Sequence, residues 1–247
     1  MVIFNSQKTE KFLFGFLLFT LFWLPLSLGA NRPWAWALMQ MSFFFIGGVL
    51  LLTHKTLLSQ LCAKYKLFVI VWLTFLTWQL MNIVPLPFAL VEAIRPQRVQ
   101  FLLNGYIENI ESIRSQWLAL SFDVGQSDVT FFKSLAYCFL FFISLTLISS
   151  AKRLKYTLIV ISGAGIFQAV YGSLEVLSGI NYSLVFKLPV SHIATGSFVY
   201  KNHYANFLLL CLSAAIGYMI ASLRVRSGSS PRERLRRIVR FWLSNKV

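Results

Sequence analysis

The chain has 247 residues, of which 57% are hydrophobic, 16% aromatic and only 13% charged, and its mean hydropathy is +0.68. Soluble domains typically carry about 25% charged residues, so this composition excludes an ordinary water-facing protein. The formal net charge of +15 suggests nucleic acid as a partner, but the basic residues follow a membrane-topology pattern, so we expect no nucleic-acid binding.

Apolar segments of bilayer length occur six times along the chain. Each is long enough to cross a hydrocarbon core of about 30 Å at a rise of about 1.5 Å per residue. They lie at about 12–30, 34–53, 67–90, 131–150, 156–178 and 204–223. We therefore predict an all-α fold, a polytopic transmembrane helical bundle, with a six-span membrane domain over residues 1–223.

The distribution of lysine and arginine predicts the orientation of these spans. Sixteen of the 23 basic residues fall in the N-terminus, the second and fourth loops and the C-terminal tail, and the other loops share the rest. Basic residues concentrate on the cytoplasmic side of membrane proteins. Both termini are therefore predicted to be cytoplasmic.

Two loops on the opposite side are longer than a tight connection between helices. In residues 91–130 the apolar positions from Val99 to Trp117 have helical spacing, which predicts an interfacial helix on the outer leaflet. Residues 179–203 contain Pro189 and two glycines and are predicted to form an irregular loop.

The tail at residues 224–247 is basic and amphipathic, with apolar and arginine-rich faces. A helix of this kind is expected to rest on the anionic cytoplasmic surface of the bilayer. It could also begin a connection to a further span.

The fifth predicted span contains an ionisable residue, Glu175. Such residues are costly in hydrocarbon and indicate function by default. Gln168, Tyr171 and Glu175 share one helix face because they are spaced i, i+3 and i+7. This face could line a polar cavity that opens outward, or it could form hydrogen bonds between helices with a solvated carboxylate at the rim.

A second polar stripe lies in the third span, where Thr74, Trp78 and Asn82 are spaced four apart. It could line the same cavity or serve in contacts between helices. The sequence does not favour either interpretation.

The densest group of polar residues opens the sixth span. Lys201, Asn202 and His203 lie where a helix is expected to begin, and Asn202 is a candidate N-cap. Helix N-termini favour anions, so a phosphate at the outer membrane boundary is one candidate ligand. The alternative is an interfacial anchor formed by the lysine and the neighbouring tyrosines.

Established catalytic and metal-binding patterns do not occur in this sequence. It has no glycine-rich phosphate loop, no HExxH and no GxSxG. Cys62, Cys138 and Cys211 lie in or beside apolar segments without a neighbouring histidine, which favours packing roles over a metal site.

Four short motifs, in this order, resemble the O-antigen ligase and O-antigen polymerase family of bacterial inner-membrane proteins. They are Val84-Pro85-Leu86-Pro87 with Arg95-Pro96, Ser121-Phe122-Asp123, Gln168-Ala-Val-Tyr-Gly172, and Gly196-Ser-Phe-Val-Tyr-Lys-Asn-His-Tyr-Ala205. The resemblance extends over roughly residues 65–243. In the last motif, Tyr200 replaces an asparagine that is usual in the family.

The resemblance implies transfer of a glycan from an undecaprenyl-diphosphate carrier on the periplasmic face of the inner membrane, without metal or nucleotide cofactors. It makes Gln168, Glu175, Lys201, Asn202 and His203 candidate substrate-binding residues. Guanidinium groups suit the binding of phosphate, and a histidine can act as a general base near neutral pH.

The family's essential arginines and histidine lie largely in a periplasmic loop beyond the sixth span, so we assign no catalytic residue in this chain. We expect it to be the N-terminal portion of such a protein, and a separately encoded C-terminal half is a candidate partner. The alternatives are a non-catalytic membrane subunit, an inactive remnant and, with less support, a small-solute transporter, which would need a broken helix or inverted repeats.

Overall fold

The computed structural model describes residues 6–105, 117–179, 182–183, 185 and 193–222. Within these residues the secondary structure is almost entirely α-helical, which confirms the predicted all-α polytopic class. The predicted tail at 224–247 lies outside the described residues.

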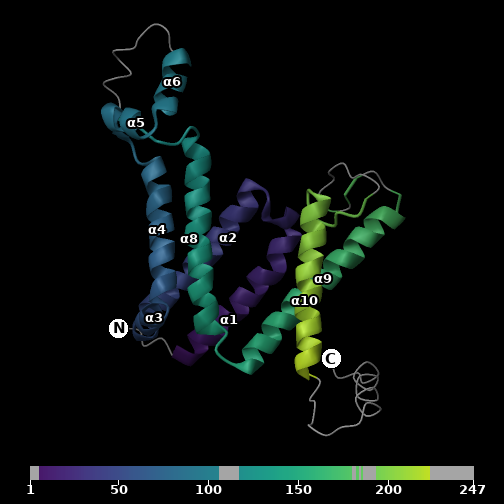
Figure 1. The fold of residues 1–247 in the computed structure, drawn as a ribbon. Helices are drawn as coiled ribbons and strands as arrows, with labels where there is room; N and C mark the ends of the chain where they lie inside the picture. The colour runs from purple at the N-terminus through teal and green to yellow at the C-terminus, as the bar shows by residue number, and fades with distance from the viewer. Residues whose placement is uncertain (1–5, 106–116, 180–181, 184, 186–192, 223–247) are drawn as a thin grey trace. The chain divides into compact units, whose positions relative to one another are not determined.

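Among the described residues, six helices are long and apolar enough to cross a membrane (Figure 1). They are α1 (Ser6–Trp23), α2 (Pro33–Thr53), α4 (Lys66–Ile83), α8 (Val124–Leu147), α9 (Ala151–Leu177) and α10 (Lys201–Ser222). The shorter elements are η1 (Leu24–Leu26), η2 (Leu28–Ala30), α3 (Lys55–Lys64), β1 (Leu86–Pro87), α5 (Phe88–Ile94), α6 (Pro96–Gly105) and β2 (Trp117–Leu118).

The start of α8 lies earlier than the predicted span at 131–150. Asp123 precedes the helix, and its Oδ1 accepts a hydrogen bond of 2.9 Å from the Gln126 N–H. A carboxylate in this position satisfies one of the N–H groups that a helix N-terminus leaves without a partner. The helix therefore begins at Val124, in polar sequence before the apolar span.

The first span is also interrupted before its predicted end at residue 30. After Trp23 the backbone forms two short 3-10 turns, and Leu28, Gly29 and Ala30 have φ angles of 57°, 62° and 55°. A Cβ at Gly29 would lie 2.5 Å from Phe198 Cδ1. This turn therefore needs glycine both for its left-handed backbone and for the approach of the Phe198 ring.

The chain divides into two compact units. One comprises residues 1–6 and 37–146, and the other comprises residues 7–36 and 147–247. We call them unit 1 and unit 2 and describe each by itself.

In unit 1, α8 packs closely against α2 and α4. A Cβ at Gly47 would lie 2.0 Å from Phe139 Cδ1, so the absence of a side chain on α2 makes room for this ring. Phe44 meets the same ring edge to face, with centroids 5.4 Å apart. On α4, the Phe68 ring stacks on Phe141 with centroids 3.8 Å apart. Aromatic pairs of this kind add to the stability gained by burying their area.

At the end of α4 opposite α3, unit 1 carries a small module made of β1, α5, α6 and β2 (Figure 1). Its core consists of Phe88, Val91, Val99 and Leu120, and β1 pairs with β2 in antiparallel fashion. The predicted interfacial helix through Trp117 is wrong at that residue, which lies in β2. Residues 106–116 of that prediction lie outside the described residues.

In unit 2, α9 and α10 approach one another at glycines. A Cβ at Gly165 would lie 2.4 Å from Cys211 Cβ, and one at Gly172 would lie 2.5 Å from the Tyr204 hydroxyl. Small residues at such positions let membrane helices pack at short range.

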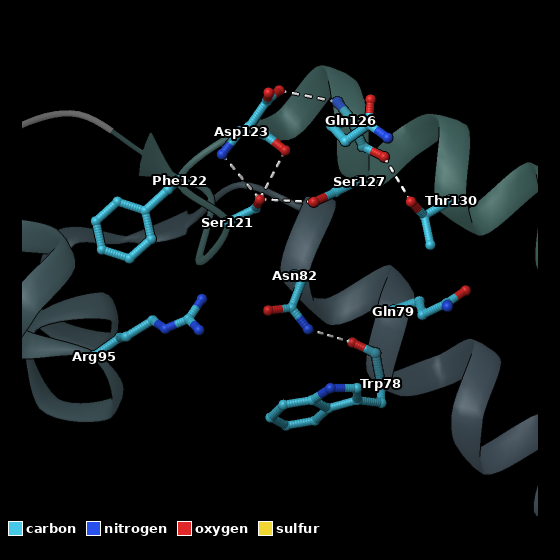
Figure 2. A pocket seen from close by; sticks show the side chains of 10 residues that line it. All are labelled: Trp78, Gln79, Asn82, Arg95, Ser121, Phe122, Asp123, Gln126, Ser127 and Thr130. Atoms are coloured by element: carbon cyan, nitrogen blue, oxygen red, sulfur yellow. Dashed lines mark hydrogen bonds between the residues drawn. The ribbon is translucent and has the colours of Figure 1, made fainter. Parts of the chain in front are cut away.

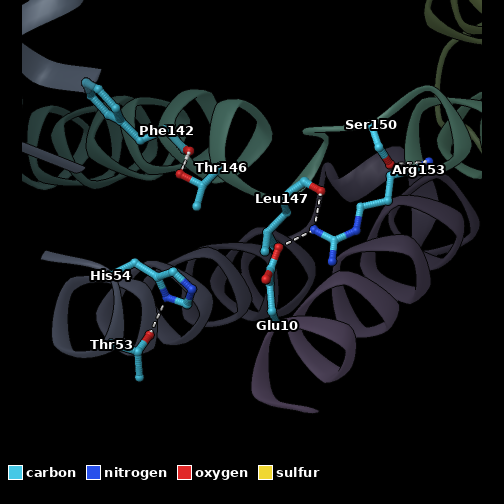
Figure 3. A network of polar contacts seen from close by, with 8 residues as sticks. All are labelled: Glu10, Thr53, His54, Phe142, Thr146, Leu147, Ser150 and Arg153. Carbon is cyan, nitrogen blue, oxygen red and sulfur yellow. Dashed lines mark hydrogen bonds and ion pairs between the residues drawn. The ribbon is translucent and has the colours of Figure 1, made fainter. Parts of the chain in front are cut away.

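A partly buried ion pair joins the beginning of α1 to the beginning of α9 in the same unit. Arg153 Nη1 contacts Glu10 Oε1 and also donates a 2.9 Å hydrogen bond to the Leu147 carbonyl oxygen (Figure 3). Ser150 caps α9 by accepting a hydrogen bond from the Arg153 N–H.

Candidate functional site

Unit 1 contains an open cleft of about 430 Å³ near the C-terminal end of α4 and the N-terminal end of α8 (Figure 2). The cleft is lined by aromatic, amide, hydroxyl and charged side chains: Trp78, Gln79, Asn82, Arg95, Ser121, Phe122, Asp123, Gln126, Ser127 and Thr130. This volume falls within the range of about 300–1,000 Å³ that is typical of small-molecule sites.

One wall of the cleft is fixed by hydrogen bonds around Ser121, which is buried. Its hydroxyl donates to the Asp123 carbonyl oxygen at 2.8 Å and lies 2.6 Å from Ser127 Oγ. The Asp123 N–H in turn donates to Ser121 Oγ. These bonds hold the turn before α8 in one conformation, so the Asp123 carboxylate and the first turn of α8 have a defined position.

The last turns of α4 form the facing wall. The Asn82 carbonyl oxygen accepts a 3.0 Å hydrogen bond from the Ser121 N–H, which ties the two walls together. The Asn82 side-chain amide donates to the Trp78 carbonyl oxygen. Gln79 Nε2 donates to Ser134 Oγ, whereas Gln79 Oε1 is buried with no hydrogen-bond partner among the described residues. The Gln79 side chain thereby joins α4 to α8.

Arg95 supplies the positive charge of the cleft. Its Nη1 donates a 2.9 Å hydrogen bond to the Leu120 carbonyl oxygen, and its guanidinium carbon lies 5.6 Å from the centre of the Phe122 ring. No carboxylate among the described residues forms an ion pair with it. Figure 2 shows the guanidinium pointing toward the space beside Asn82 and Ser121. Its remaining donors form no hydrogen bond with a described residue, and a guanidinium suits an anionic or hydroxyl-rich ligand.

Taken together, the lining suits a ligand with many hydroxyl groups. Amide, hydroxyl and carboxylate groups can exchange several hydrogen bonds with such a ligand, and the faces of Trp78 and Phe122 offer apolar area. Trp78 is 59% exposed, so its ring is accessible. Among the described lining residues Asp123 is the one carboxylate, and one of its oxygens is committed to capping α8.

Of the residues proposed from the sequence, Gln168 lies in unit 2 and is completely buried. Its Nε2 donates to the Pro25 carbonyl oxygen at 2.9 Å and to Ser197 Oγ, and its Oε1 accepts from the Ser197 N–H at 3.0 Å. Gln168 thus joins the turn after α1 to the loop before α10. Of the two interpretations offered for this face, hydrogen bonding between segments applies to Gln168.

Glu175 is also buried, with 4% of its surface exposed, and neither carboxylate oxygen has a hydrogen-bond partner among the described residues. It is therefore not a solvated residue at the rim of the helix, which corrects that alternative. Tyr171 lies one turn earlier on α9, and its hydroxyl lies 3.0 Å from Ser183 Oγ.

The residues at the start of the sixth span have a different environment. Lys201, Asn202 and His203 are exposed, whereas Gln168 and Glu175 are buried. The Tyr200 carbonyl oxygen accepts the first hydrogen bond of α10, from the Tyr204 N–H. Asn202 therefore lies within the first turn, and its prediction as the N-cap is wrong.

The sequence reasoning did not identify the cleft as a site, although two of its family-like motifs contribute to it. Arg95 and the Ser121-Phe122-Asp123 stretch line the same cleft, although they lie near opposite ends of the connection between α4 and α8. The available signal was the helix-start pattern of Asp123 followed by Gln126 before an apolar run. The partner of that turn, the end of α4, lies far from it in the sequence.

Comparison with known proteins gives no further assignment. No family model, no curated protein and no solved structure matches this chain.

Proposed function

We propose that this chain is part of an O-antigen ligase-like or polymerase-like protein of a bacterial inner membrane, and that its cleft binds a glycan attached to an undecaprenyl-diphosphate carrier. The observation that carries the proposal is the composition of the cleft. It combines an arginine that forms no ion pair with a described residue with amides, hydroxyls and aromatic faces at one end of two membrane helices.

The location of the cleft suits a substrate that is anchored in lipid. α4 and α8 meet the criteria for membrane spans, and the cleft lies where α4 ends and α8 begins. A carrier chain in the bilayer would bring its diphosphate and first sugars to this boundary. The positive-inside pattern of the sequence predicts that this boundary faces the periplasm.

The cleft supports binding more strongly than bond breaking. Its lining has no histidine among the described residues, and one oxygen of Asp123 is engaged in capping α8. A general base must reach the proton that it removes, and among the described lining residues only the second oxygen of Asp123 could take this role. This favours the alternative of a non-catalytic subunit, in which this chain holds the glycan and another polypeptide supplies the catalytic groups.

The transporter alternative receives less support from the helices. α2, α4, α8, α9 and α10 each run without interruption over their described lengths. Transport sites are typically built from helices broken near the middle of the membrane.

A binding measurement on the full chain in nanodiscs tests the proposal. Wild-type protein is expected to bind an undecaprenyl-diphosphate oligosaccharide, and Arg95→Ala is expected to weaken binding about 10-fold to 100-fold, because a hydrogen bond to a charged group contributes about 1.5–3 kcal/mol. The Gln126 side chain forms no hydrogen bond with a described residue, so Gln126→Ala should also weaken binding without changing stability.

Arg32→Ala is the matched control, since Arg32 is also exposed and predicted to lie on the outer side. Failure of the wild-type protein to bind the glycan lipid would refute the proposal. Equal dissociation constants for wild type and both cleft variants would refute the assignment of the cleft.

A further inference from the structure

Glu175 is a buried ionisable residue for which the described residues provide no charge partner. It lies in α9, a helix with the length and composition of a membrane span, and it is 4% exposed. It forms no ion pair with a described residue, and both of its carboxylate oxygens lack hydrogen-bond partners. Buried carboxylates are ordinarily paired, hydrogen-bonded or bound to a cation.

The side chains around Glu175 present oxygen atoms. Tyr171 precedes it by one helical turn on the same face, and Tyr204 of α10 packs against Gly172 on the adjoining position of that face. Both tyrosines are close enough to interact electrostatically with the carboxylate. Ser183, which is 6% exposed, lies against the Tyr171 hydroxyl.

These hydroxyls are engaged with other partners. The Tyr204 hydroxyl donates to the Gln168 carbonyl oxygen at 3.1 Å. The Tyr171 hydroxyl lies 3.0 Å from Ser183 Oγ and accepts a hydrogen bond from the Val185 N–H. The group thus presents oxygen lone pairs near the carboxylate, and no positively charged group of the described chain balances them.

A metal cation uses more of these oxygen atoms than a proton does. A proton on the carboxyl can be shared with one acceptor, whereas a cation is bound by several oxygen atoms at once. A hard cation holds its oxygen ligands at about 2.3–2.6 Å from itself. The ligands can therefore lie farther from one another than two hydrogen-bonded atoms.

We propose that Glu175, with the Tyr171, Tyr204 and Ser183 hydroxyls, forms a binding site for a small monovalent cation such as Na⁺. One carboxylate among neutral oxygens matches a single positive charge. A divalent ion would leave a net charge in a medium of low dielectric constant. The cation would link α9 to α10 and to the loop that contains Ser183, and this proposal does not depend on the function of the cleft in unit 1.

The test is thermal unfolding of the full chain in detergent, in NaCl and in N-methyl-D-glucamine chloride at equal concentration. Equal ionic strength makes charge screening the same in both salts. The wild-type melting temperature is expected to be higher in NaCl, by roughly 5 °C or more once Na⁺ reaches about 100 times its dissociation constant.

Glu175→Gln removes the charge and keeps the shape, so it should melt at the same temperature in both salts and above wild type in the organic salt. Tyr171→Phe should raise the Na⁺ concentration needed for half of the shift. Glu92→Gln, which alters an exposed carboxylate, should retain the full shift.

Three outcomes would overturn the proposal. The first is a wild-type melting temperature that does not depend on Na⁺, including the case in which lowering the pH alone stabilises the protein. The second is an equal Na⁺ shift in Glu175→Gln. The third is a loss of stability in Glu175→Gln in both salts. That result would mean that the carboxylate is paired with a basic residue of the chain and not with a cation.

Discussion

Replacing Gln168 by leucine is expected to destabilise unit 2 strongly, although the two side chains are similar in size. The change removes both hydrogen bonds donated by Nε2 and leaves the buried Ser197 N–H without its acceptor. The Pro25 carbonyl oxygen keeps the hydrogen bond from Ser197 Oγ. One unsatisfied buried donor costs about 1–3 kcal/mol, and each lost hydrogen bond costs about 0.5–1.5 kcal/mol. We expect a total loss of about 2–6 kcal/mol.

The assay is chemical or thermal unfolding in detergent, followed by circular dichroism at a helix-sensitive wavelength. Gln60→Leu provides the control, because Gln60 is exposed on α3 and its replacement should change stability by less than about 0.5 kcal/mol. If Gln168→Leu unfolded at the same temperature or denaturant concentration as wild type, the assignment of Gln168 as a buried connection between segments would be refuted. The cavity-lining role considered from the sequence would then regain support.

Three further changes test the packing of unit 2 by the same unfolding measurements. Gly165→Ala should cost about 1–3 kcal/mol through overpacking, and it should cost less when combined with Cys211→Gly, which removes the atoms that the new Cβ would meet; additive effects would contradict this contact. Gly29→Ala should cost more than about 1 kcal/mol, because φ is +62° and the Cβ would meet Phe198; unchanged stability would show that the turn is not constrained. Glu10→Gln should cost roughly 1–2 kcal/mol in wild type and much less in an Arg153→Ala background; equal costs in the two backgrounds would argue against the ion pair.

The membrane helices could be predicted because their signal is local. Length and apolarity identify a span without knowledge of its neighbours, and all six predicted spans have counterparts in the structure. The predicted ends of the spans agree less closely with the helices of the structure. α8 begins at Val124 because the Asp123 carboxylate caps polar residues that a hydropathy criterion leaves out, and the left-handed turn at Gly29 ends the first helix within an apolar run.

The roles of individual polar residues depended on partners distant in the sequence. Gln168 and Glu175 share a helix face, as predicted, but their partners decide what each one does. Gln168 is satisfied by Pro25 and Ser197, which lie 143 and 29 residues away, whereas neither carboxylate oxygen of Glu175 has a hydrogen-bond partner among the described residues. Helical periodicity gives the face of a residue and not its partner.

The cleft illustrates the same limit. The sequence is compatible with either a cavity or helix contacts for the stripe that contains Trp78 and Asn82. In the structure both residues line the cleft in unit 1. Thr74, the third member of the stripe, donates its hydroxyl to the Ile70 carbonyl oxygen within its own helix and is not part of the lining. Arg95 became a candidate only when the fold brought it beside the turn at Ser121.

Site-specific photo-crosslinking in membranes tests most directly whether the cleft binds a lipid-linked glycan. A photoreactive amino acid at position 126 would report on the cleft, and one at position 73, where Leu73 on α4 is 58% exposed outside the cleft lining, would report on the surrounding lipid. We predict that position 126 crosslinks to the undecaprenyl-diphosphate oligosaccharide, that position 73 does not, and that Arg95→Ala reduces the product at position 126. Crosslinking to phospholipid alone at both positions, or equal glycan labelling at both, would contradict the proposed role of the cleft.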